Sequence, residues 1–302
     1  VLLPVPLRDD GKKCSGILLA VSSLPSKYGI GSFDKTAYDF VDFLEKAGQS
    51  CWQILPLGPT SYGDSPYQSF STFAGNPYFI DFESAAEDGY LTEQDYKSVD
   101  WGENEQYVDY GNIFIKRHQV FAKLQSNFEK NVPEDYYAFC RDNAFWLDDY
   151  ALFMAIKDEH GGKAFDTWED DIRCRKGESV HLWSAKCYHR VQYYKILQYL
   201  FFKQWNKLKS YANEKGISII GDLPIYVSAD SSDVWAEPKQ FNLDENYKPI
   251  EVAGCPPDAF SRDGQLWGNP TYRWDTLSEN GFDWWISRLS HCSKLFDTVR
   301  LD

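Results

Sequence analysis

The sequence has no cluster of lysine and arginine residues and is short of positive charge overall. Its 31 lysines and arginines stand against 45 aspartates and glutamates, which gives a net charge of −14. A chain this acidic is a poor candidate for binding nucleic acid or an anionic membrane surface. It also lacks an apolar run of membrane-spanning length, and the apolar start Val1–Leu7 lacks the basic region and cleavage site of a signal peptide. We therefore expect neither nucleic acid nor a membrane as a partner.

Closely paired cysteines are also missing. The cysteines are seven in number and scattered, and no two form a C-x-x-C pair. This pattern argues against a disulfide framework or a zinc knuckle and favours reduced thiols in a cytoplasm. Two cysteines and two histidines lie close together between residues 174 and 189, but their spacing fits no zinc pattern. We expect no metal.

What the sequence has in excess is aromatic residues, including 11 tryptophans and 20 tyrosines. Several of the rings gather in Gly58–Asp81 (GPTSYGDSPYQSFSTFAGNPYFID), which is too rich in glycine, proline and serine to be a helix. Rings interleaved with short polar groups suit a ligand that is alternately apolar and hydroxylated, such as a sugar. They equally suit a loop that folds under its own aromatic side chains. At this point both interpretations stay open.

Short apolar segments alternate with amphipathic helices along the chain. Gly16–Val21 predicts a first buried strand and Cys51–Leu57 a second, with a helix between them that ends at Gly48, so residues 16–57 form one strand–helix–strand unit. A third strand is expected at Ile217–Ile220 and a fourth at Thr298–Asp302.

Helices are expected before both later strands. A helix over 194–212, ended by Gly216, precedes the third strand. The helix before the fourth strand is expected to bury one apolar face, made of Trp285, Leu289, Cys292 and Phe296.

Two long stretches interrupt this alternation. Helical periodicity over 110–128, and again from Pro133 to Gly161, indicates that residues 83–186 form a helical insertion. Residues 228–281 look irregular, with a hairpin expected around Asp244–Asn246. They also hold two loops, CPPDAFS (255–261) and GQLWGNP (264–270).

Such alternation predicts an α/β fold with a parallel sheet, either doubly wound or part of a (β/α)8 barrel. Gly29 and Gly31 come too late after the first strand to complete a dinucleotide-binding loop, so we expect no nucleotide cofactor. Long insertions after successive strands favour the barrel, whose active site is built from loops at the carboxyl ends of the strands. Four strands would be half of it.

Carboxylates stand at the ends of two of these strands. Asp222 follows the third strand, and Asp302 ends the fourth. In a barrel both would point into one mouth, as the two carboxylates of glycoside chemistry do. Arg300, two residues before Asp302, lies on the same side of the strand and would keep that carboxylate ionised and nucleophilic. Taken singly, Asp222 also fits a turn residue, and Arg300 with Asp302 a surface ion pair.

Five segments, in order, resemble the amylomaltase family, the 4-alpha-glucanotransferases or disproportionating enzymes of the alpha-amylase clan. They are SGILLAVSSLPSKYGIG, QSCWQILPLGPTSYGDSPYQSFSTFAGNPYFID, GISIIGDLPIYVSADSSDVW, GCPPDAFSRDGQLWGNPTYRW and FDTVRLD. SYGDSPYQSFS and GQLWGNP are the most specific, and only residues 1–13 have no counterpart. The resemblance implies a (β/α)8 barrel with inserted subdomains that transfers alpha-1,4-glucan segments by a retaining double displacement without a cofactor.

The resemblance also implies roles for individual residues. Asp302 of the V-R-[IL]-D motif would be the nucleophile with Arg300 beside it, and Asp222 would be an active-site carboxylate that shapes the sugar subsite. The other residues implied to contact the glucan are Tyr62, Ser65 and Tyr67 of the first loop, Asp258 and Phe260 of PPDAFS, and Gln265 and Trp267 of GQLWGNP.

The family's acid/base glutamate, its third catalytic aspartate and a histidine after the nucleophile have no counterpart within residues 1–302. We therefore expect the polypeptide to continue with the other half of the barrel, in the same chain or in a partner fragment. The leading hypothesis is a cytoplasmic 4-alpha-glucanotransferase that uses an alpha-1,4-glucan donor and a sugar acceptor. An alpha-glucan hydrolase on the same barrel and a non-catalytic glucan-binding fragment are the alternatives.

Overall fold

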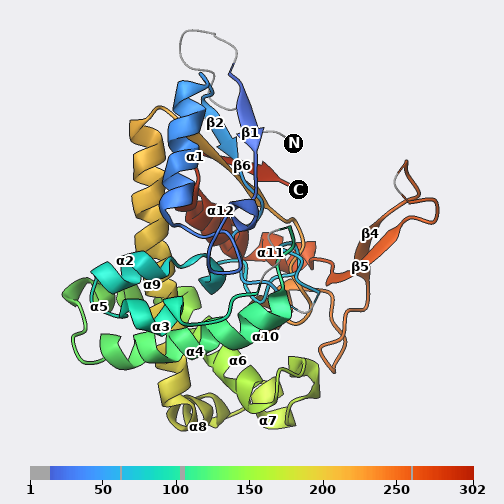
Figure 1. The fold of residues 1–302 in the computed structure, drawn as a ribbon. Coiled ribbons are helices and arrows are strands. Elements are labelled where there is room, and N and C mark those ends of the chain that lie inside the picture. The colour runs from blue at the N-terminus through green and yellow to red at the C-terminus, as the bar shows by residue number, and fades with distance from the viewer. Residues whose placement is uncertain (1–13, 62, 103–105, 260) are drawn as a thin grey trace.

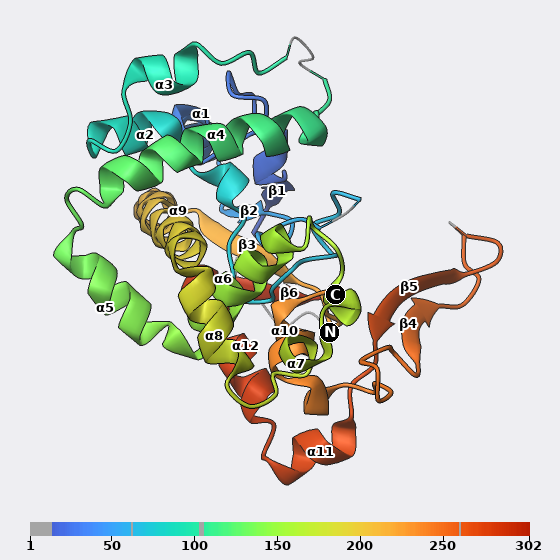
Figure 2. The ribbon, with the colours of Figure 1, turned by 90° about the horizontal axis from the view of Figure 1, so that it is seen from below.

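Four parallel strands form the central sheet of the computed structural model, which describes residues 14–61, 63–102, 106–259 and 261–302. They are β1 (Gly16–Leu18), β2 (Cys51–Gln53), β3 (Ser218–Leu223) and β6 (Thr298–Leu301). They lie side by side in this order, and every neighbouring pair is parallel (Figure 1, with all four strands labelled in Figure 2). The predicted α/β fold with a parallel sheet is confirmed.

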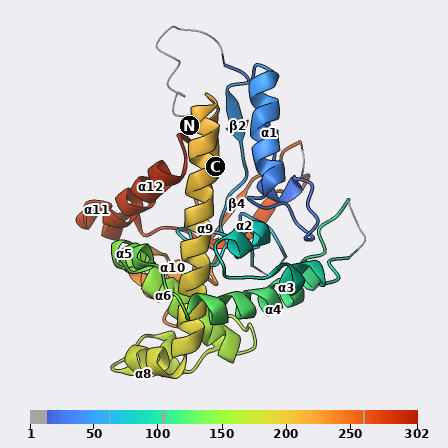
Figure 3. The same ribbon diagram turned by 60° about the vertical axis from the view of Figure 1, so that its left-hand side comes forward.

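The connections between consecutive strands run through α1 (Lys35–Lys46), α9 (Tyr188–Glu214) and α12 (Asp283–Leu295). Helix α9 packs against both α1 and α12, and Figure 3 shows it between them with β2 behind. The order of these four strands in space is their order in the chain, without the reversal that defines a doubly wound sheet.

The extent of the first strand was predicted wrongly. Gly16–Val21 was expected to be buried, but β1 ends at Leu18, which is 58% exposed, and Val21 begins a 3₁₀ turn, η1 (Val21–Ser23). Within the described residues β1 pairs only with β2, so its other edge is open and the apolar pattern has nothing to be buried against. β2 is shorter than predicted too, although Ile54 still donates to the Ile220 carbonyl at 3.0 Å.

The residues between β2 and α9 form a layer of helices, which lies in the lower part of Figure 1. Helix α4 has the predicted bounds, Tyr110–Phe128. The stretch after Pro133 is two helices instead of one, because the chain turns at Asn143. The layer comprises α2 (Phe82–Glu87), α3 (Glu93–Lys97), α4, α5 (Glu134–Asp142), α6 (Ala144–Glu159), α7 (Asp170–Arg173) and α8 (Ser179–Lys186), with 3₁₀ turns η2 (Pro77–Phe79) and η3 (Phe165–Thr167).

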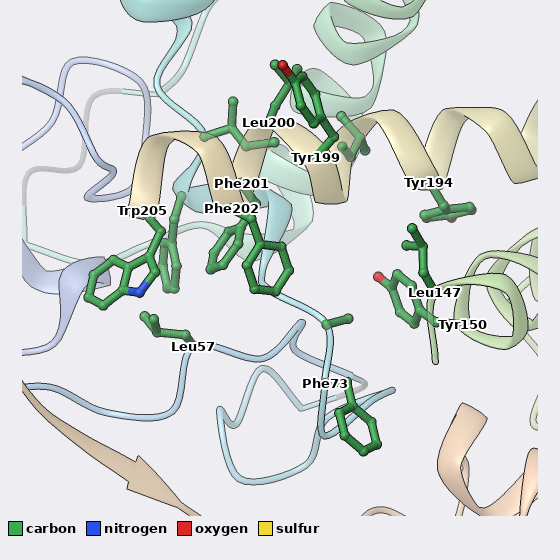
Figure 4. Packing of buried hydrophobic residues seen from close by; sticks show 14 of the residues in the cluster. Leu57, Phe73, Leu147, Tyr150, Tyr194, Tyr199, Leu200, Phe201, Phe202 and Trp205 are labelled. Atoms are coloured by element: carbon green, nitrogen blue, oxygen red, sulfur yellow. The ribbon is translucent and has the colours of Figure 1, made fainter. Parts of the chain in front are cut away.

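Helix α9 lies at the centre of the hydrophobic core. It is longer than the predicted helix over 194–212, because Val191 and Tyr193 extend its buried face towards the N-terminus. Figure 4 shows Phe201, Phe202 and Trp205 projecting from α9 towards the segment that carries Leu57 and Phe73. That segment comes so close that a Cβ on Gly75 would lie 2.1 Å from the Phe201 ring, so only glycine fits there. No helix among the described residues is long and apolar enough to cross a bilayer.

The buried face of α12 differs from the expected one. Trp284, Arg288, His291, Cys292 and Leu295 are buried, whereas Leu289 is exposed and Phe296 lies just past the helix. The apolar pattern alone was misleading because a cation and a histidine of this helix point inward, where they bind backbone carbonyls.

The chain between β3 and α12 contains a projecting hairpin, β4 (Val252–Cys255) and β5 (Gln265–Pro270), which stands away from the body in Figure 2. GQLWGNP was expected to be a loop, but all of it except Gly264 forms β5, because it pairs with β4. The turn near Asp244 is confirmed, since the backbone N–H of Asp244 donates to the Lys248 carbonyl at 2.8 Å. The remaining elements are α10 (Ser232–Ala236), η4 (Pro238–Gln240) and α11 (Trp274–Glu279).

Candidate active site

Asp222 lies near the carboxyl end of β3, with its side chain buried. The residue before it must be glycine, because a Cβ on Gly221 would lie 2.2 Å from the Phe296 ring. Phe296 leads from α12 into β6, so this close approach packs the start of β6 against β3. The local sequence thereby fixes a carboxylate at the end of a buried strand.

Arg300 on β6 joins this carboxylate to a second one. The parallel register pairs Asp222 with Arg300, and Nη1 of Arg300 donates to both Asp222 oxygens, at 3.0 and 2.9 Å. Nη2 of Arg300 donates to Oδ1 of Asp302 at 2.6 Å. The predicted convergence of Asp222, Arg300 and Asp302 at one end of the sheet is present.

The loop Gly58–Asp81 contributes Tyr67 to the same cluster. The hydroxyl of Tyr67 donates to Oδ2 of Asp222 at 2.7 Å, and Ser65 accepts from the Tyr67 N–H at 3.3 Å. Burial and the hydrogen bond to the Asp222 carboxylate raise the pKa of Tyr67 to about 12, so the phenol stays a proton donor. Ser65 therefore supports the backbone of Tyr67, and Tyr67 itself reaches the carboxylate.

The charges of the cluster differ in their exposure to water. Burial raises the pKa of Asp222 above its usual value despite the donors on Tyr67 and Arg300. Burial would lower the pKa of Arg300, but the two aspartates outweigh it and raise that pKa. The side chain of Asp302 is 39% exposed and that of Arg300 is 36% exposed, whereas Asp222 is enclosed.

A cavity of about 50 Å³ is lined in part by Tyr67, Asp222 and Arg288. It offers room for about one or two waters and is too small for a sugar ring. Among the described residues, no group of three or more histidine, cysteine or acidic side chains could hold a metal ion.

Some aromatic residues of the loop fit a loop folded under its own rings, and others fit a ligand-binding surface. Phe73 and Phe79 are buried in the core, as expected for a loop folded under its own rings. Tyr67 and Phe70 are only partly buried. Tyr62 lies outside the described residues, as does Phe260.

The hairpin carries three of the predicted glucan contacts, Asp258, Gln265 and Trp267. Asp258 accepts from the Ser261 N–H at 2.8 Å, and Gln265 accepts from the Trp267 indole N–H at 3.0 Å. Trp267 as a whole is 45% exposed. Asp258, Gln265 and Trp267 are all exposed to solvent.

Two residues that the sequence analysis did not single out connect the hairpin to the loop. Gln68 donates to the Trp267 carbonyl at 3.1 Å and to the Asn269 side chain at 2.7 Å. Asn269 in turn donates to the Val227 carbonyl at 2.8 Å. Both residues stand inside the motifs GDSPYQS and GQLWGNP, so their presence in the two most specific segments was the available signal.

An α/β sheet that holds two carboxylates and a bridging arginine at adjacent strand ends is the kind of scaffold used for glycoside chemistry. The chain belongs to the 4-alpha-glucanotransferase family, since the family model of that description matches residues 19–302.

Individual relatives agree with this membership. The chain is 51% identical over 283 residues to the 4-alpha-glucanotransferase of Clostridium butyricum, which covers 93% of this chain and 58% of that protein. It is 47% identical over 291 residues to that of Thermus thermophilus, and this alignment covers 95% of this chain and 57% of that protein. The chain thus spans somewhat more than half the length of the curated relatives it matches.

Solved structures are similar as well. An amylomaltase from Streptococcus agalactiae in complex with acarbose superposes with a TM-score of 0.93 at 46% identity, over 96% of this chain and 59% of that one. An amylomaltase from Corynebacterium glutamicum has a TM-score of 0.77 at 18% identity, over 100% of this chain and 42% of that one, which speaks for the fold alone.

Proposed function

We propose that the complete protein is a cytoplasmic 4-alpha-glucanotransferase and that this chain is the N-terminal part of its (β/α)8 barrel. The sequential strand order, with α1, α9 and α12 side by side, supports a barrel. The open edge of β1 and the 58% coverage of a relative support a missing half. Residues 83–186 and 228–281 would be insertions into the barrel.

The observation that carries the proposal is the bridge from Asp222 through Arg300 to the more exposed Asp302. In the first step, an Asp302 oxygen forms a bond to the anomeric carbon of the donor as the glycosidic bond breaks. The leaving oxygen takes its proton from an acid outside residues 1–302. In the second step, the 4-hydroxyl of an acceptor sugar attacks the glycosyl-enzyme, gives its proton to the same group and releases Asp302.

The remaining predicted residues would hold the glucan. Tyr67 and Ser65, together with Tyr62, would line the donor site, and Asp222 would shape the sugar subsite. The hairpin residues Asp258, Phe260, Gln265 and Trp267 would extend over the bound chain. Apolar ring faces with adjacent hydrogen-bonding groups suit neutral sugars, and this chemistry needs no cofactor.

Maltotriose separates transfer from the alternatives. The complete enzyme should convert maltotriose to glucose and a ladder of longer oligomers, with nearly constant total reducing ends. A steady rise in reducing ends without longer products would indicate a hydrolase, and unchanged maltotriose with retained binding would indicate a glucan-binding protein. The same reaction after exhaustive chelation should be unchanged.

A further inference from the structure

Arg288 is a buried cation of α12 that lies outside the carboxylate cluster. All of its nitrogens are engaged: Nε donates to the Thr72 hydroxyl at 2.5 Å, Nη1 to the Ile225 carbonyl at 2.8 Å, and Nη2 to the Pro224 carbonyl. Nη1 also lies 3.2 Å from the Tyr272 hydroxyl. The planar guanidinium of Arg288 therefore joins the loop at Thr72 to the segment that follows β3.

Thr72 forms a second buried hydrogen bond, through its backbone. The buried carboxylate of Asp233, on α10, accepts from the Thr72 N–H at 2.8 Å. Next to it, Ser232 donates its hydroxyl to the Phe70 carbonyl at 3.0 Å. The backbone and the side chain of Thr72 are thus fixed by opposite charges that come from two different helices.

The two segments held in this way carry the two partners of a site contact. Thr72 lies five residues after Tyr67 in the loop, and Pro224 and Ile225 directly follow β3, which ends just past Asp222. Tyr67 and Asp222 meet at 2.7 Å. A shift of the loop relative to the segment after β3 would therefore change the distance between Tyr67 and Asp222.

We propose that Arg288 and Asp233 are positioning residues that set Tyr67 against Asp222 through Thr72. The inference rests on the proposed function, because it assigns the pair a part in glucosyl transfer. Neither residue needs to touch the glucan. A positional error of about 1 Å in a catalytic site can cost about a hundredfold in rate, so a clamp of this kind has a measurable effect.

The chain offers a matched control in Arg117. This arginine of α4 is as buried as Arg288, and it donates to the Ile80 carbonyl at 3.1 Å and to the Tyr28 carbonyl at 3.3 Å. Its Nε has no hydrogen-bond partner within the described part of the chain. It shares the burial and the carbonyl contacts of Arg288 but touches neither Thr72 nor the segment after β3.

The experiment compares Arg288→Lys, Thr72→Val and Arg117→Lys in the complete enzyme. Lysine keeps the charge but cannot span the three acceptors, and valine removes only the hydroxyl that Nε contacts. Two quantities are measured: hydrogen–deuterium exchange of the peptide covering residues 69–75, and kcat and KM for maltotriose per folded molecule.

In Arg288→Lys the exchange of this peptide should accelerate about tenfold or more, and kcat should fall about 10- to 100-fold with KM changed far less. Thr72→Val should move both quantities in the same direction by a smaller factor, and it keeps the test open if the arginine variant does not fold. Arg117→Lys should leave both close to wild type once the folded fraction is counted.

Unchanged exchange in both Arg288→Lys and Thr72→Val would overturn the clamp. Faster exchange with normal kcat, or an equal loss of kcat in Arg117→Lys, would overturn the positioning role. If the wild-type enzyme transfers no glucosyl units, the proposed function fails, and the exchange data alone still decide whether Arg288 clamps the loop.

Discussion

The loop Gly58–Asp81 and the β4–β5 hairpin are both expected to bind glucan, but they are held in opposite ways. Buried polar side chains of α9, α10 and α12 pin the second half of the loop to the core. These side chains and their loop partners are Gln198 with Gly75, Gln204 with Asp81, Ser232 with Phe70, Asp233 and Arg288 with Thr72, and His291 with Phe73. The hairpin projects from the body, and Leu266 on β5 is 82% exposed.

The difference shows where rigidity is needed. Groups that take part in bond making must be preorganised, and buried hydrogen bonds supply that at the strand ends. A segment that covers a polymeric ligand gains from freedom to adapt. We therefore expect substitutions in the cluster to change kcat and substitutions in the hairpin to change KM.

The largest effect is expected for Asp302→Asn. Loss of the attacking carboxylate should lower kcat in the complete enzyme by about four powers of ten or more, because an amide cannot form the glycosyl-enzyme. Maltotriose binding, measured by calorimetry, should largely persist. A fluorinated glucosyl donor should label the wild-type peptide that contains Asp302. The exposed Asp275→Asn is the control, and a label on another peptide would refute the assignment.

Arg300→Lys comes next. Lysine keeps the charge but cannot reach both aspartates as the guanidinium does, so kcat should fall about a hundredfold while the protein stays folded. Steady-state kinetics on maltotriose and a thermal unfolding curve provide the two readouts. A variant with nearly normal kcat would mean that the bridge between Asp222 and Asp302 is not needed for turnover.

The buried His291, which binds the Phe73 carbonyl, makes the stability of the protein depend on pH. Burial lowers the pKa of His291 to about 4, from an ordinary value of about 6.5. Between these values the unfolded chain takes up a proton that the folded chain does not, so stability is full above about pH 6.5 and falls as the pH drops towards 4. The loss attributable to this one group should approach about 3 kcal/mol.

His291→Gln can still donate to the Phe73 carbonyl but cannot titrate. Its free energy of unfolding, measured with urea at several pH values, should therefore depend less on pH than that of the wild type. The exposed His181→Gln is the control. Parallel curves for wild type and His291→Gln would show that the imidazole is not buried in its neutral form.

The smallest effect is expected on the hairpin. Trp267→Ala removes an exposed ring that could stack on a sugar, which is worth about 1 kcal/mol, so KM should rise about three- to tenfold with kcat nearly unchanged. Leu266→Ala, next to it on the other face of β5, should leave both constants unchanged. A large fall in kcat for Trp267→Ala would mean that the hairpin takes part in the chemistry.

The strand–helix alternation and the meeting of the strand-end charges could be predicted from the sequence. Helix α4 was placed with its bounds because nineteen residues give a long periodic signal. Asp222, Arg300 and Asp302 could be expected together because parallel strands end at one edge of a sheet. In both cases local geometry decides the outcome.

The buried hydrogen bonds that hold the loop Gly58–Asp81 could not be predicted from local sequence patterns. Charged and polar residues on a helix usually face water, so Arg288 and His291 gave no sign that they are buried. Their partners are backbone carbonyls more than 60 residues away, and sequence patterns do not reveal such contacts. β5 was missed because glycine and proline in GQLWGNP resemble a loop until the partner strand is known.

The pairing of Asp222 with Arg300 across β3 and β6 also governs which changes in chain length the protein can tolerate. One residue inserted between Phe296 and Arg300 would shift the register and turn the arginine to the opposite face of the sheet, away from both aspartates. Insertions and deletions among related chains should therefore be absent from residues 297–302.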